Sequence, residues 1–542
     1  MIVFGSRGSD LALCQSRMVA KALTAATGEE VRIEVIETRG DRILDKPLPM
    51  IGGKGLFTEE LEHALRDGRI DAAVHSMKDL PVCDPDGLTI GAVPERRSPH
   101  DVLICAPGAV DVGAEHMPLR MGSRVGTSSH RRRSALERLR SDLQFLDIRG
   151  NVPTRVDKVR RGDYDAVVLA AAGLDRLQLP IDGLERHELP LAWSTPAPSQ
   201  GVLAVQCRVD DARVLELLAH LNNPVAAMCA NAERDVLYRL GGGCSMPLGV
   251  LVTPQGETVR MQAAYYTNPE HGLSRAAAVF ADLQGEDAMQ LAAEIAERWR
   301  PMVEAPLRGA NILMLRPDGH SGNFDDTLAV AGAELHNVAL TQVVPLAGVS
   351  ITREQLEGKV LAFTSARAVD LFCQAAAGIE LQGLAVFAGG PATAAAAERH
   401  GMRASAPPDG SGGAFLAQHI VARGTPPGGV LFPCADERHP DLEEALAAQG
   451  IAVRAVPLYR TESLAGPLTS VVLPALDDVI IVFTSPSAVR AFATLSPMPA
   501  KHVAIGPSTA AAMESASVRC DATTSEPTAI ALIQTCLELR NV

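Results

Sequence analysis

The 542-residue chain lacks several patterns that would assign it to a class at once. Its ten cysteines stand singly, with no C-x-x-C pair and no Cys/His ligand spacing, which argues against a disulfide framework and a zinc site. It has no run of about 18 apolar residues, so we expect no membrane span. The first residues do not resemble a secretory signal, and we therefore expect a cytoplasmic protein without a metal.

Nucleotide motifs and an extended positive charge are also missing. Neither G-x-x-x-x-G-K-[ST] nor G-x-G-x-x-G after a strand occurs, and we interpret the Gly-rich stretch IGGKGLF around Lys54 as a mobile surface loop. The formal net charge is −14, which disfavours nucleic-acid binding because phosphate neutralisation needs a broad positive surface. A length of 542 residues allows three to five domains, at roughly 100–200 residues each.

One segment differs from this acidic background. Arginines are concentrated between Arg120 and Arg161, with few acidic residues among them. A local concentration of guanidinium groups in an acidic protein indicates a pocket for a small polyanion. For RRRSALERLR taken alone, a solvated charged helix face is the alternative.

Short apolar strands alternate with amphipathic helices in the first third of the chain, which is typical of an α/β fold. One expected helix begins after Ser9 as N-cap and ends before Gly28. Polar residues follow the expected strands, and open α/β sheets bind ligands at the carboxyl ends of their strands. We therefore expect one polyanion site built from these turns, which hold Arg7, Ser9, Lys78, Asp79, Ser129, Arg131, Arg132, Arg149 and Arg155.

Two residues in this first part have a chemistry of their own. Asp79 is a carboxylate among cations, and it either forms a surface ion pair with Lys78 or stabilises positive charge that develops on a ligand. Cys244 lies in RLGGGCSMPLG, where three glycines favour an exposed loop. The residues leave open whether its thiol is a nucleophile, a point of covalent attachment or without a role.

Eight ordered motifs make residues 1–305 similar to the porphobilinogen deaminase (hydroxymethylbilane synthase) family: RGSDLA, GGKGLF, HSMKDLP, RVGTSSHRR, IRGNVPTR, AAGLDRL, PSQG and LGGGCSMPLG. The resemblance implies two lobes like those of periplasmic binding proteins and a small α+β domain that carries the cofactor. It further implies a dipyrromethane cofactor attached through a thioether to Cys244, and chain extension by four porphobilinogen units with loss of ammonia to give hydroxymethylbilane.

The resemblance also implies roles for individual residues. Asp79 would hold pyrrole N–H groups and stabilise cationic intermediates. Cofactor carboxylates would be bound by Lys78, Ser129, Arg131 and Arg132, and substrate and the growing chain by Arg7, Ser9, Arg149, Arg155 and Arg176. Three positions depart from the family: Pro153 and Ser199 stand where glycine is expected, and His130 where an apolar residue is common. Pro153 fits the first turn of a helix.

An internal repeat follows a boundary near Pro306. VLAFTSARAVDLF at 360–372 is echoed by IIVFTSPSAVRAF at 480–492, and AGGPATAAAA at 388–397 by AIGPSTAAAM at 504–513, which indicates two similar α/β lobes. With LRP, PLYRTE and SEPTAIAL, these motifs make residues 308–542 similar to the uroporphyrinogen-III synthase family. That family cyclises the linear tetrapyrrole with inversion of its last ring, the next step of the same pathway.

Candidate residues in this second part are hydroxyl groups. Tyr459 would help hydroxide leave, or it is a hinge residue packed between the lobes. Ser365, Ser485 and Thr509 would bind substrate carboxylates, whereas the alternative for each serine is a helix cap only. Arg367 stands where asparagine is frequent in the family, which leaves a weakened synthase half as an alternative.

Together the two resemblances predict a fused enzyme of porphyrin and heme biosynthesis, a transferase followed by a lyase. Its ligands would be porphobilinogen and the linear tetrapyrrole, and a monomer is compatible with the sequence. A non-catalytic anion-binding protein is the rival, but it gives Cys244 and Asp79 no purpose. For the deaminase we expect a first domain of residues 1–95 and 195–215, a second of 100–192 and a third of 218–303, which carries the cofactor. A linker of 304–309 follows. For the synthase we expect one lobe of 310–344 and 461–542 and a second lobe of 346–459.

Overall fold

The computed structural model describes residues 1–38, 58–243, 245–269, 276–303, 305–316, 324–407, 413–424, 427–438, 440–464, 479–494 and 500–540. Cys244 and the expected loop around Lys54 lie outside these residues. The chain divides into two units, one of Met1–Asn311, Gly322–Leu335 and Thr528–Val542, the other of Ile312–Ser321 and His336–Pro527. The boundaries expected from the sequence stay predictions.

A five-stranded sheet begins the first unit. Its strands in spatial order are β2 (Val31–Val35), β1 (Ile2–Ser6), β3 (Ala72–Ser76), β10 (Leu203–Arg208) and β4 (Leu88–Ala92). β1 is parallel to β2 and β3, whereas β10 is antiparallel to β3. Alternate residues of the strands pack on helices at both faces, α1 (Asp10–Thr27) and α8 (Ala212–Ala219) on one and α4 (Glu59–Arg66) on the other. As expected, Ser9 caps α1 and Gly28 ends it with a φ of 72°.

A second sheet of the same kind follows. Its strands are β7 (Gln144–Leu146), β6 (Arg124–Gly126), β8 (Ala166–Ala170), β5 (Asp101–Cys105) and β9 (Glu185–Glu188), and its helices are α5 (His130–Glu137), α6 (Val152–Arg160) and α7 (Ala171–Leu177). On β5, Leu103 and Cys105 pack in the core shared with α5, whereas Val102 and Ile104 pack in the core shared with α6 and α7. Pro153 lies in the first turn of α6, as its position predicted.

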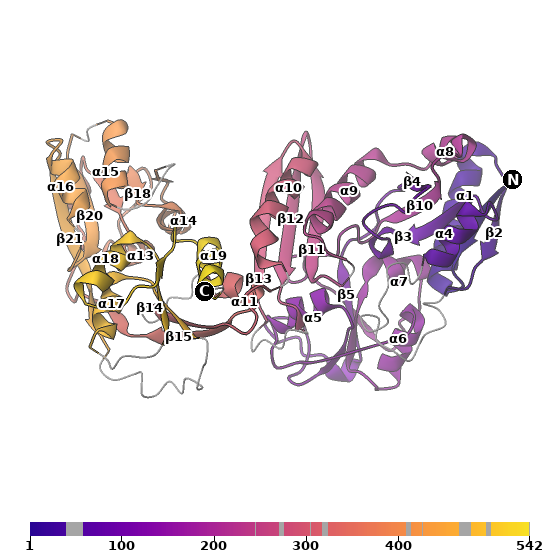
Figure 1. Ribbon diagram of the computed structural model, residues 1–542, viewed down its shortest axis with the longest axis horizontal. Coiled ribbons are helices and arrows are strands. Elements are labelled where there is room, and N and C mark those ends of the chain that lie inside the picture. Colours follow the sequence, from indigo (N-terminus) through magenta and orange to yellow (C-terminus); the bar gives the residue numbers. More distant parts are fainter. Residues whose placement is uncertain are drawn as a thin grey trace. The chain divides into compact units, whose positions relative to one another are not determined.

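The third part of this unit is an antiparallel sheet with two long helices. It contains β11 (Leu248–Gln255), β12 (Thr258–Tyr266), β13 (Ala278–Gly285), α9 (Pro224–Arg239) and α10 (Ala288–Trp299), and the helices run alongside the strands in Figure 1. Gly256 takes a φ of 65° in the turn between β11 and β12. The remaining helices of the unit are α11 (Phe324–Val330), α19 (Ala529–Arg540) and the 3-10 turns η1 (Met77–Asp79), η2 (Pro107–Ala109) and η4 (Arg300–Met302).

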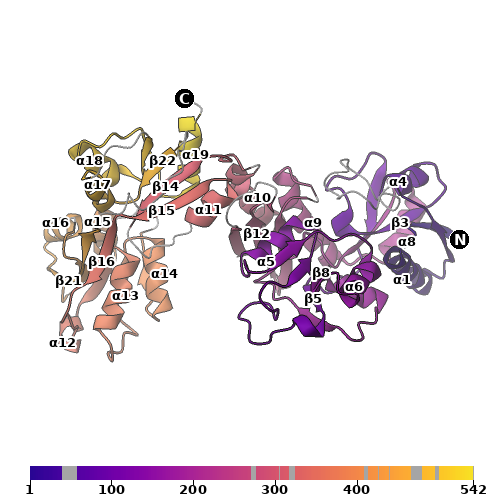
Figure 2. The same ribbon diagram turned by 90° about the horizontal axis from the view of Figure 1, so that it is seen from below.

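The other unit is built on two further sheets. One consists of β15 (Glu334–Ala339), β14 (Asn311–Arg316), β22 (Val479–Phe483), β23 (Lys501–Ala504) and β24 (Ala522–Thr523), with α17 (Pro486–Phe492) and α18 (Pro507–Ser515) side by side next to it (Figure 2). The other consists of β16 (Thr341–Pro345), β21 (Val453–Ser463), β20 (Val430–Ala435), β17 (Val360–Phe363), β18 (Val386–Ala388) and β19 (Ala404–Ser405). Its helices are α12 (Arg353–Leu356), α13 (Ala366–Ala375), α14 (Pro391–Arg399), α15 (Gly413–Ala422) and α16 (Asp441–Ala447).

The internal repeat expected from the sequence is confirmed down to single contacts. β17 leads into α13 as β22 leads into α17, and Ser365 and Ser485 are the matching N-caps. An edge-to-face ring pair follows in each copy, Phe363 with Phe372 and Phe483 with Phe492. The mixed α/β class predicted for the whole chain is therefore confirmed. None of the helices in the described ranges is long and apolar enough to cross a membrane.

Candidate active site

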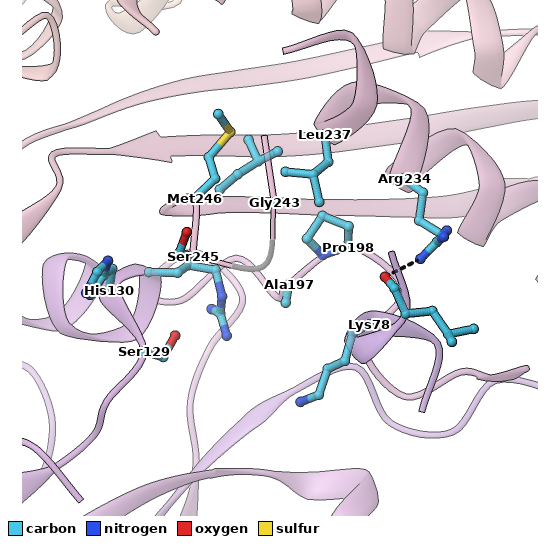
Figure 3. Close-up of a pocket in the computed structure, with 13 residues that line it drawn as sticks. Lys78, Ser129, His130, Ala197, Pro198, Arg234, Leu237, Gly243, Ser245 and Met246 are labelled. Carbon is cyan, nitrogen blue, oxygen red and sulfur yellow. Dashed lines mark hydrogen bonds between the residues drawn. The ribbon is translucent and has the colours of Figure 1, made fainter. Parts of the chain in front are cut away.

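A small cavity in the first unit collects residues from four different segments. It has a volume of about 60 Å³ and is lined by Lys78, Leu80, Ser129, His130, Arg131, Ala197, Pro198, Arg234, Leu237, Gly243, Ser245, Met246 and Leu248 (Figure 3). Lys78 comes from the turn after β3 and Ser129 from the turn after β6, at the carboxyl ends of strands. Gly243 and Ser245, the two neighbours of Cys244 in the sequence, complete the lining.

Lys78 and Asp79 form the short turn η1 at the end of β3. Lys78 is half-buried and donates from Nζ to Oε1 of Gln200 at 3.2 Å, whereas Asp79 is exposed. The pKa of Lys78 is lowered to about 8, mainly by burial and then by the positive charge of Arg132, while Asp79 and Asp101 oppose the shift. Two positive and two negative groups thus act on the lysine, and burial is the main cause of its lowered pKa.

Arg131 and Arg132 are both buried, and both bind the same buried carboxylate. Asp101, the first residue of β5, accepts from Nη2 of Arg131 at 2.9 Å and from Nη2 of Arg132 at 2.7 Å. Burial alone would raise the pKa of Asp101, but the two guanidinium groups hold it far below its usual range. Ser129 caps α5 by accepting from the backbone N–H of Arg132.

The arginines of RRRSALERLR differ in burial, so the interpretation as a solvated charged helix face does not apply to all of them. Arg131 and Arg132 are internal, while Arg133 lies 3.6 Å from Glu137 on a more exposed part of α5. The family roles of Ser129, Arg131 and Arg132 stay predictions. In the described residues Arg131 already has protein partners, the Ser194 hydroxyl and the Thr195 carbonyl as well as Asp101.

Arg149 and Arg155 bring further positive charge to the same region. Burial lowers the pKa of Arg155 to about 10, with the charges of Arg132 and Arg149 acting in the same direction and Asp79 against it. Its Nε donates to the Gly150 carbonyl at 2.8 Å, which fixes the side chain at the start of α6. The structure thus places Arg132, Arg149 and Asp79 within electrostatic reach of Arg155.

Arg7, Ser9 and Arg176 lie in other parts of this unit. Ser9 is the cap of α1, and Arg7 precedes it, close enough to His75 to contribute to the lowered pKa of that buried imidazole, about 4. Arg176 donates from Nη2 to the Gly201 carbonyl at 2.7 Å. Burial lowers its pKa to about 10, with Arg97 as the next cause. Their substrate-binding roles stay predictions.

Two buried acids were missed by the sequence analysis. Asp101 stands before the apolar run VLIC, and Glu233 lies in the middle of α9 and is fully buried. Glu233 accepts from Nη1 of Arg96 at 2.5 Å and from the backbone N–H groups of Ser199 and Val252. An acidic residue at the start of an apolar strand was a signal that could have identified Asp101.

Ser199, where glycine was expected, has a left-handed backbone. Its φ is 58°, a conformation that glycine adopts without strain and that other residues rarely adopt. The residue is fully buried, and its N–H donates to Glu233 at 2.6 Å. The departure from the family therefore leaves the backbone conformation expected of a glycine in place.

The second unit brings two of its four predicted residues together. The Tyr459 hydroxyl lies 3.2 Å from the Ser365 hydroxyl, and Ser365 also accepts from the Ala368 N–H as the cap of α13. Ser485 has the same cap role on α17 and lies 2.9 Å from the Ser487 hydroxyl, while Thr509 is buried in the first turn of α18. The cap interpretation is confirmed for both serines, and substrate binding stays a prediction for all four residues.

The residues of the first site suit a dipyrromethane group. Each pyrrole carries an acetate and a propionate, and Lys78, Arg131, Arg132 and Arg155 supply more positive charge than Asp79 and Asp101 neutralise. Burial is the main cause of the lowered pKa values of Lys78 and Arg155, with neighbouring arginines as a further cause, and bound anionic groups would favour the charged forms of both. The cavity of about 60 Å³ holds only part of such a group, so its rings would extend beyond it. Within the described residues no cluster of His, Cys, Asp and Glu could hold a metal ion.

Three family models match the chain. "Porphobilinogen deaminase, dipyromethane cofactor binding domain" matches residues 2–216, and "Porphobilinogen deaminase, C-terminal domain" matches residues 227–300. "Uroporphyrinogen-III synthase HemD" matches residues 322–534. The two resemblances found in the sequence are thereby confirmed, each over the part of the chain where its motifs lie.

Individual relatives agree with these matches. A porphobilinogen deaminase of Roseiflexus sp. (strain RS-1) is 48% identical over 262 residues, which cover 48% of this chain and 84% of the relative. One of Moorella thermoacetica is 46% identical over 263 residues, covering 48% and 82%. A solved uroporphyrinogen-III synthetase of Helicobacter pylori 26695 is 18% identical with a TM-score of 0.32, covering 43% of this chain and 98% of that chain. The second half is assigned by its family model and not by this weak structural likeness.

Proposed function

We infer two activities from one premise: the chain belongs to the porphobilinogen deaminase family and continues into a uroporphyrinogen-III synthase region. It is a bifunctional enzyme of tetrapyrrole biosynthesis. The first region condenses porphobilinogen to hydroxymethylbilane, and the second cyclises that product to uroporphyrinogen III. Neither a non-catalytic anion-binding protein nor a weakened synthase half is favoured by these matches. The residues assigned below to each step are our proposal.

The cofactor would be held by the cations around the cavity. Lys78, Arg131 and Arg132 would bind its carboxylates, with the Ser129 hydroxyl as a further donor, and Cys244 would form the thioether. When bound, dipyrromethane supplies the pyrrole carbon to which the first substrate unit is joined. The observation that carries this proposal is the cavity lining, where Lys78, Ser129 and Arg131 occur together with both neighbours of Cys244.

Asp79 is the proposed catalytic carboxylate of the first activity. It is exposed at the end of β3, next to Lys78 and within electrostatic reach of Arg155, so a substrate bound by the cations would face it. Pyrrole N–H groups can donate to its carboxylate. Its negative charge would stabilise the positive charge that develops on the substrate as ammonia leaves.

The remaining cations would bind the substrate and the growing chain. Arg149 and Arg155 lie beside Arg132, so carboxylates can pass from one guanidinium group to the next as the chain lengthens. Arg7, Ser9 and Arg176 lie at the ends of β1 and in α7, and would bind more distant carboxylates. This division of roles follows the family pattern position by position.

In the synthase region, Tyr459 would act as the acid that helps hydroxide leave. Ser365 would orient it, because their hydroxyl groups are 3.2 Å apart. Ser365, Ser485 and Thr509 would donate hydrogen bonds to substrate carboxylates from the N-termini of α13, α17 and α18. The repeat places equivalent donors in both lobes.

Intact mass measurement of the purified full chain tests the proposal. We expect an excess equal to two porphobilinogen units less two ammonia molecules, and its complete loss in Cys244→Ala. Cys83→Ala is a matched control, since Cys83 is an exposed cysteine of the same unit and should retain the adduct. Both variants should still cyclise hydroxymethylbilane supplied from outside. A wild-type chain that stays unmodified after incubation with porphobilinogen would contradict the attachment.

A further inference from the structure

We propose that Asp101 is a positioning residue of the deaminase site, holding the guanidinium groups of Arg131 and Arg132 in the orientation that binds ligand carboxylates. The proposal rests on the proposed function, because it assumes that these two arginines meet the cofactor. It adds a residue that the sequence motifs did not single out.

One carboxylate receives five hydrogen bonds at this point. Oδ1 of Asp101 accepts from Nε and Nη2 of Arg132 at 2.9 and 2.7 Å, and from Nε2 of Gln200 at 3.0 Å. Oδ2 accepts from Nη2 of Arg131 at 2.9 Å and from the Ser194 hydroxyl at 2.7 Å. Asp101 is fully buried, so no water competes for these bonds.

Asp101 differs in what it binds from Glu233, the other fully buried acid among the described residues of this unit. Glu233 accepts from the backbone N–H groups of Ser199 and Val252 as well as from Arg96, and thus joins segments of the main chain. All five donors of Asp101 are side-chain groups, and three of them belong to Arg131 and Arg132, of which Arg131 lines the cavity. Its contacts therefore orient functional groups more than they join main-chain segments.

The geometry leaves donors for a ligand. Arg131 uses three N–H groups, on Asp101, Ser194 and the Thr195 carbonyl, and Arg132 uses three, on Asp101 and the Val168 carbonyl. A guanidinium group has five N–H donors in a fixed plane. In the described part of the chain, each arginine thus keeps two donors without an acceptor, and two donors suit a bidentate carboxylate.

Asp101 also limits the positive charge that the site must bury. Gln200 links it to Lys78, donating to Asp101 and accepting from Lys78 Nζ at 3.2 Å. Around Lys78, Asp79 and Asp101 favour the charged lysine, while Arg131 and Arg132 disfavour it. Without Asp101, the only carboxylate among these groups would be Asp79, which is exposed.

The test compares the variants Asp101→Asn and Asp165→Asn of the full chain. Both are produced in the absence of porphobilinogen, so that they start without the cofactor. Asp165 is the matched control, since it binds Arg124 through both carboxylate oxygens in the same lobe and lines no part of the cavity. After porphobilinogen is added, the rate of adduct formation is followed by intact mass. We expect about a tenfold slower rate in Asp101→Asn and a wild-type rate in Asp165→Asn, because misplaced binding groups lose much of their effect.

A second readout does not depend on loading. Competitive acylation of the ligand-free chain, followed by peptide mass analysis, reports the titration midpoint of Lys78. We expect the midpoint to fall in Asp101→Asn and to stay unchanged in Asp165→Asn. If Asp101→Asn does not fold, Asp101→Glu keeps the charge but moves the carboxylate by one methylene, and we expect about threefold slower loading.

The outcomes separate the two proposals. If the wild-type chain forms no adduct with porphobilinogen, the proposed attachment is contradicted. The role of Asp101 is then tested by the titration midpoint of Lys78, and an unchanged midpoint in Asp101→Asn would overturn it. A wild-type chain that loads, with Asp101→Asn or Asp101→Glu loading at the same rate, overturns the positioning role. Slow loading of the Asp101 variants together with normal loading of Asp165→Asn supports it.

Discussion

The two candidate sites of this chain are built from different chemical groups. The candidate deaminase site gathers Lys78, Arg131 and Arg132 around the buried carboxylate of Asp101, with Arg155 within electrostatic reach of Arg132. The synthase region offers the hydroxyl groups of Ser365, Ser485, Thr509 and Tyr459, the first three of them at the N-termini of helices. Both would bind the same type of ligand, a pyrrole chain with acetate and propionate groups.

This difference shows two ways of binding carboxylates. Charged donors bind them strongly, but burying such donors together is costly, as the lowered pKa values of Lys78 and Arg155 indicate. Serine and threonine hydroxyls at helix N-termini stay neutral and bind more weakly. A covalently anchored chain tolerates strong binding, whereas a product that must leave favours the weaker donors. Substitutions should therefore have larger effects in the deaminase site.

Asp79→Asn should have the largest effect. The amide cannot stabilise developing positive charge, so we expect the rate of hydroxymethylbilane formation to fall by about 10²- to 10³-fold. Cyclisation of supplied hydroxymethylbilane should not change. Asp86→Asn, at an exposed acid a few residues further on, is the control. If the rates of both variants fall by similar factors, Asp79 has no special role and the comparison of the two sites loses its main support.

Arg96→Met should cause the largest loss of stability. It leaves Glu233 buried without its cationic partner, and the remaining donors are the Ser199 and Val252 N–H groups. We expect the free energy of unfolding to fall by about 3 kcal/mol, measured by urea denaturation. Asp282→Asn, which breaks an ion pair with Arg260 on the surface, should cost less than about 1 kcal/mol. Equal losses would contradict the importance of buried charge in this unit.

Tyr459→Phe should have a moderate effect, confined to the synthase. It removes the hydroxyl group that lies 3.2 Å from Ser365 but keeps the ring. We expect about a tenfold slower enzymatic cyclisation, because general acid catalysis by one group is worth at least that much. The fraction of the type I isomer, formed spontaneously, should rise. Arg460→Gln, at the exposed neighbouring position, should behave like the wild type. A Tyr459→Phe variant with normal cyclisation would favour the hinge interpretation.

Much of the fold and part of the site could be predicted from the sequence. Lys78, Asp79 and Ser129 follow short apolar runs, and strands of that pattern end at one edge of a sheet. The repeat around Ser365 and Ser485 was visible because the same residues recur at the same spacing. Such local sequence patterns can be recognised without knowledge of the fold.

The contacts between distant residues could not be predicted. Asp101 meets Arg131 30 residues later and Gln200 99 residues later, and no periodicity links these positions. The sequence motifs therefore point to ligand carboxylates as the partners of Arg131 and Arg132 and give no sign of the internal carboxylate that both bind. The left-handed backbone of Ser199 was also hidden, since serine gives no sign of a positive φ.

Lys78→Gln should have the smallest effect, and its size should depend on pH. Burial lowers the pKa of Lys78 from 10.5 to about 8, so the folded chain loses this proton more readily than the unfolded chain. Lys78 therefore destabilises the ligand-free fold below pH 8, and this penalty disappears as pH rises from about 8 to 10.5.

On the proposed attachment the Cys244→Ala chain would hold no cofactor. In this chain, Lys78→Gln should raise the free energy of unfolding at pH 7 by about 1 kcal/mol. The gain should vanish near pH 10, and Lys21→Gln, at an exposed lysine on α1, should show neither change. A gain that is absent at pH 7, or that grows towards pH 10, would mean that burial of the Lys78 charge carries no such penalty. The deaminase and synthase sites would then not differ in the way proposed, because the cost of concentrated cations is what separates them.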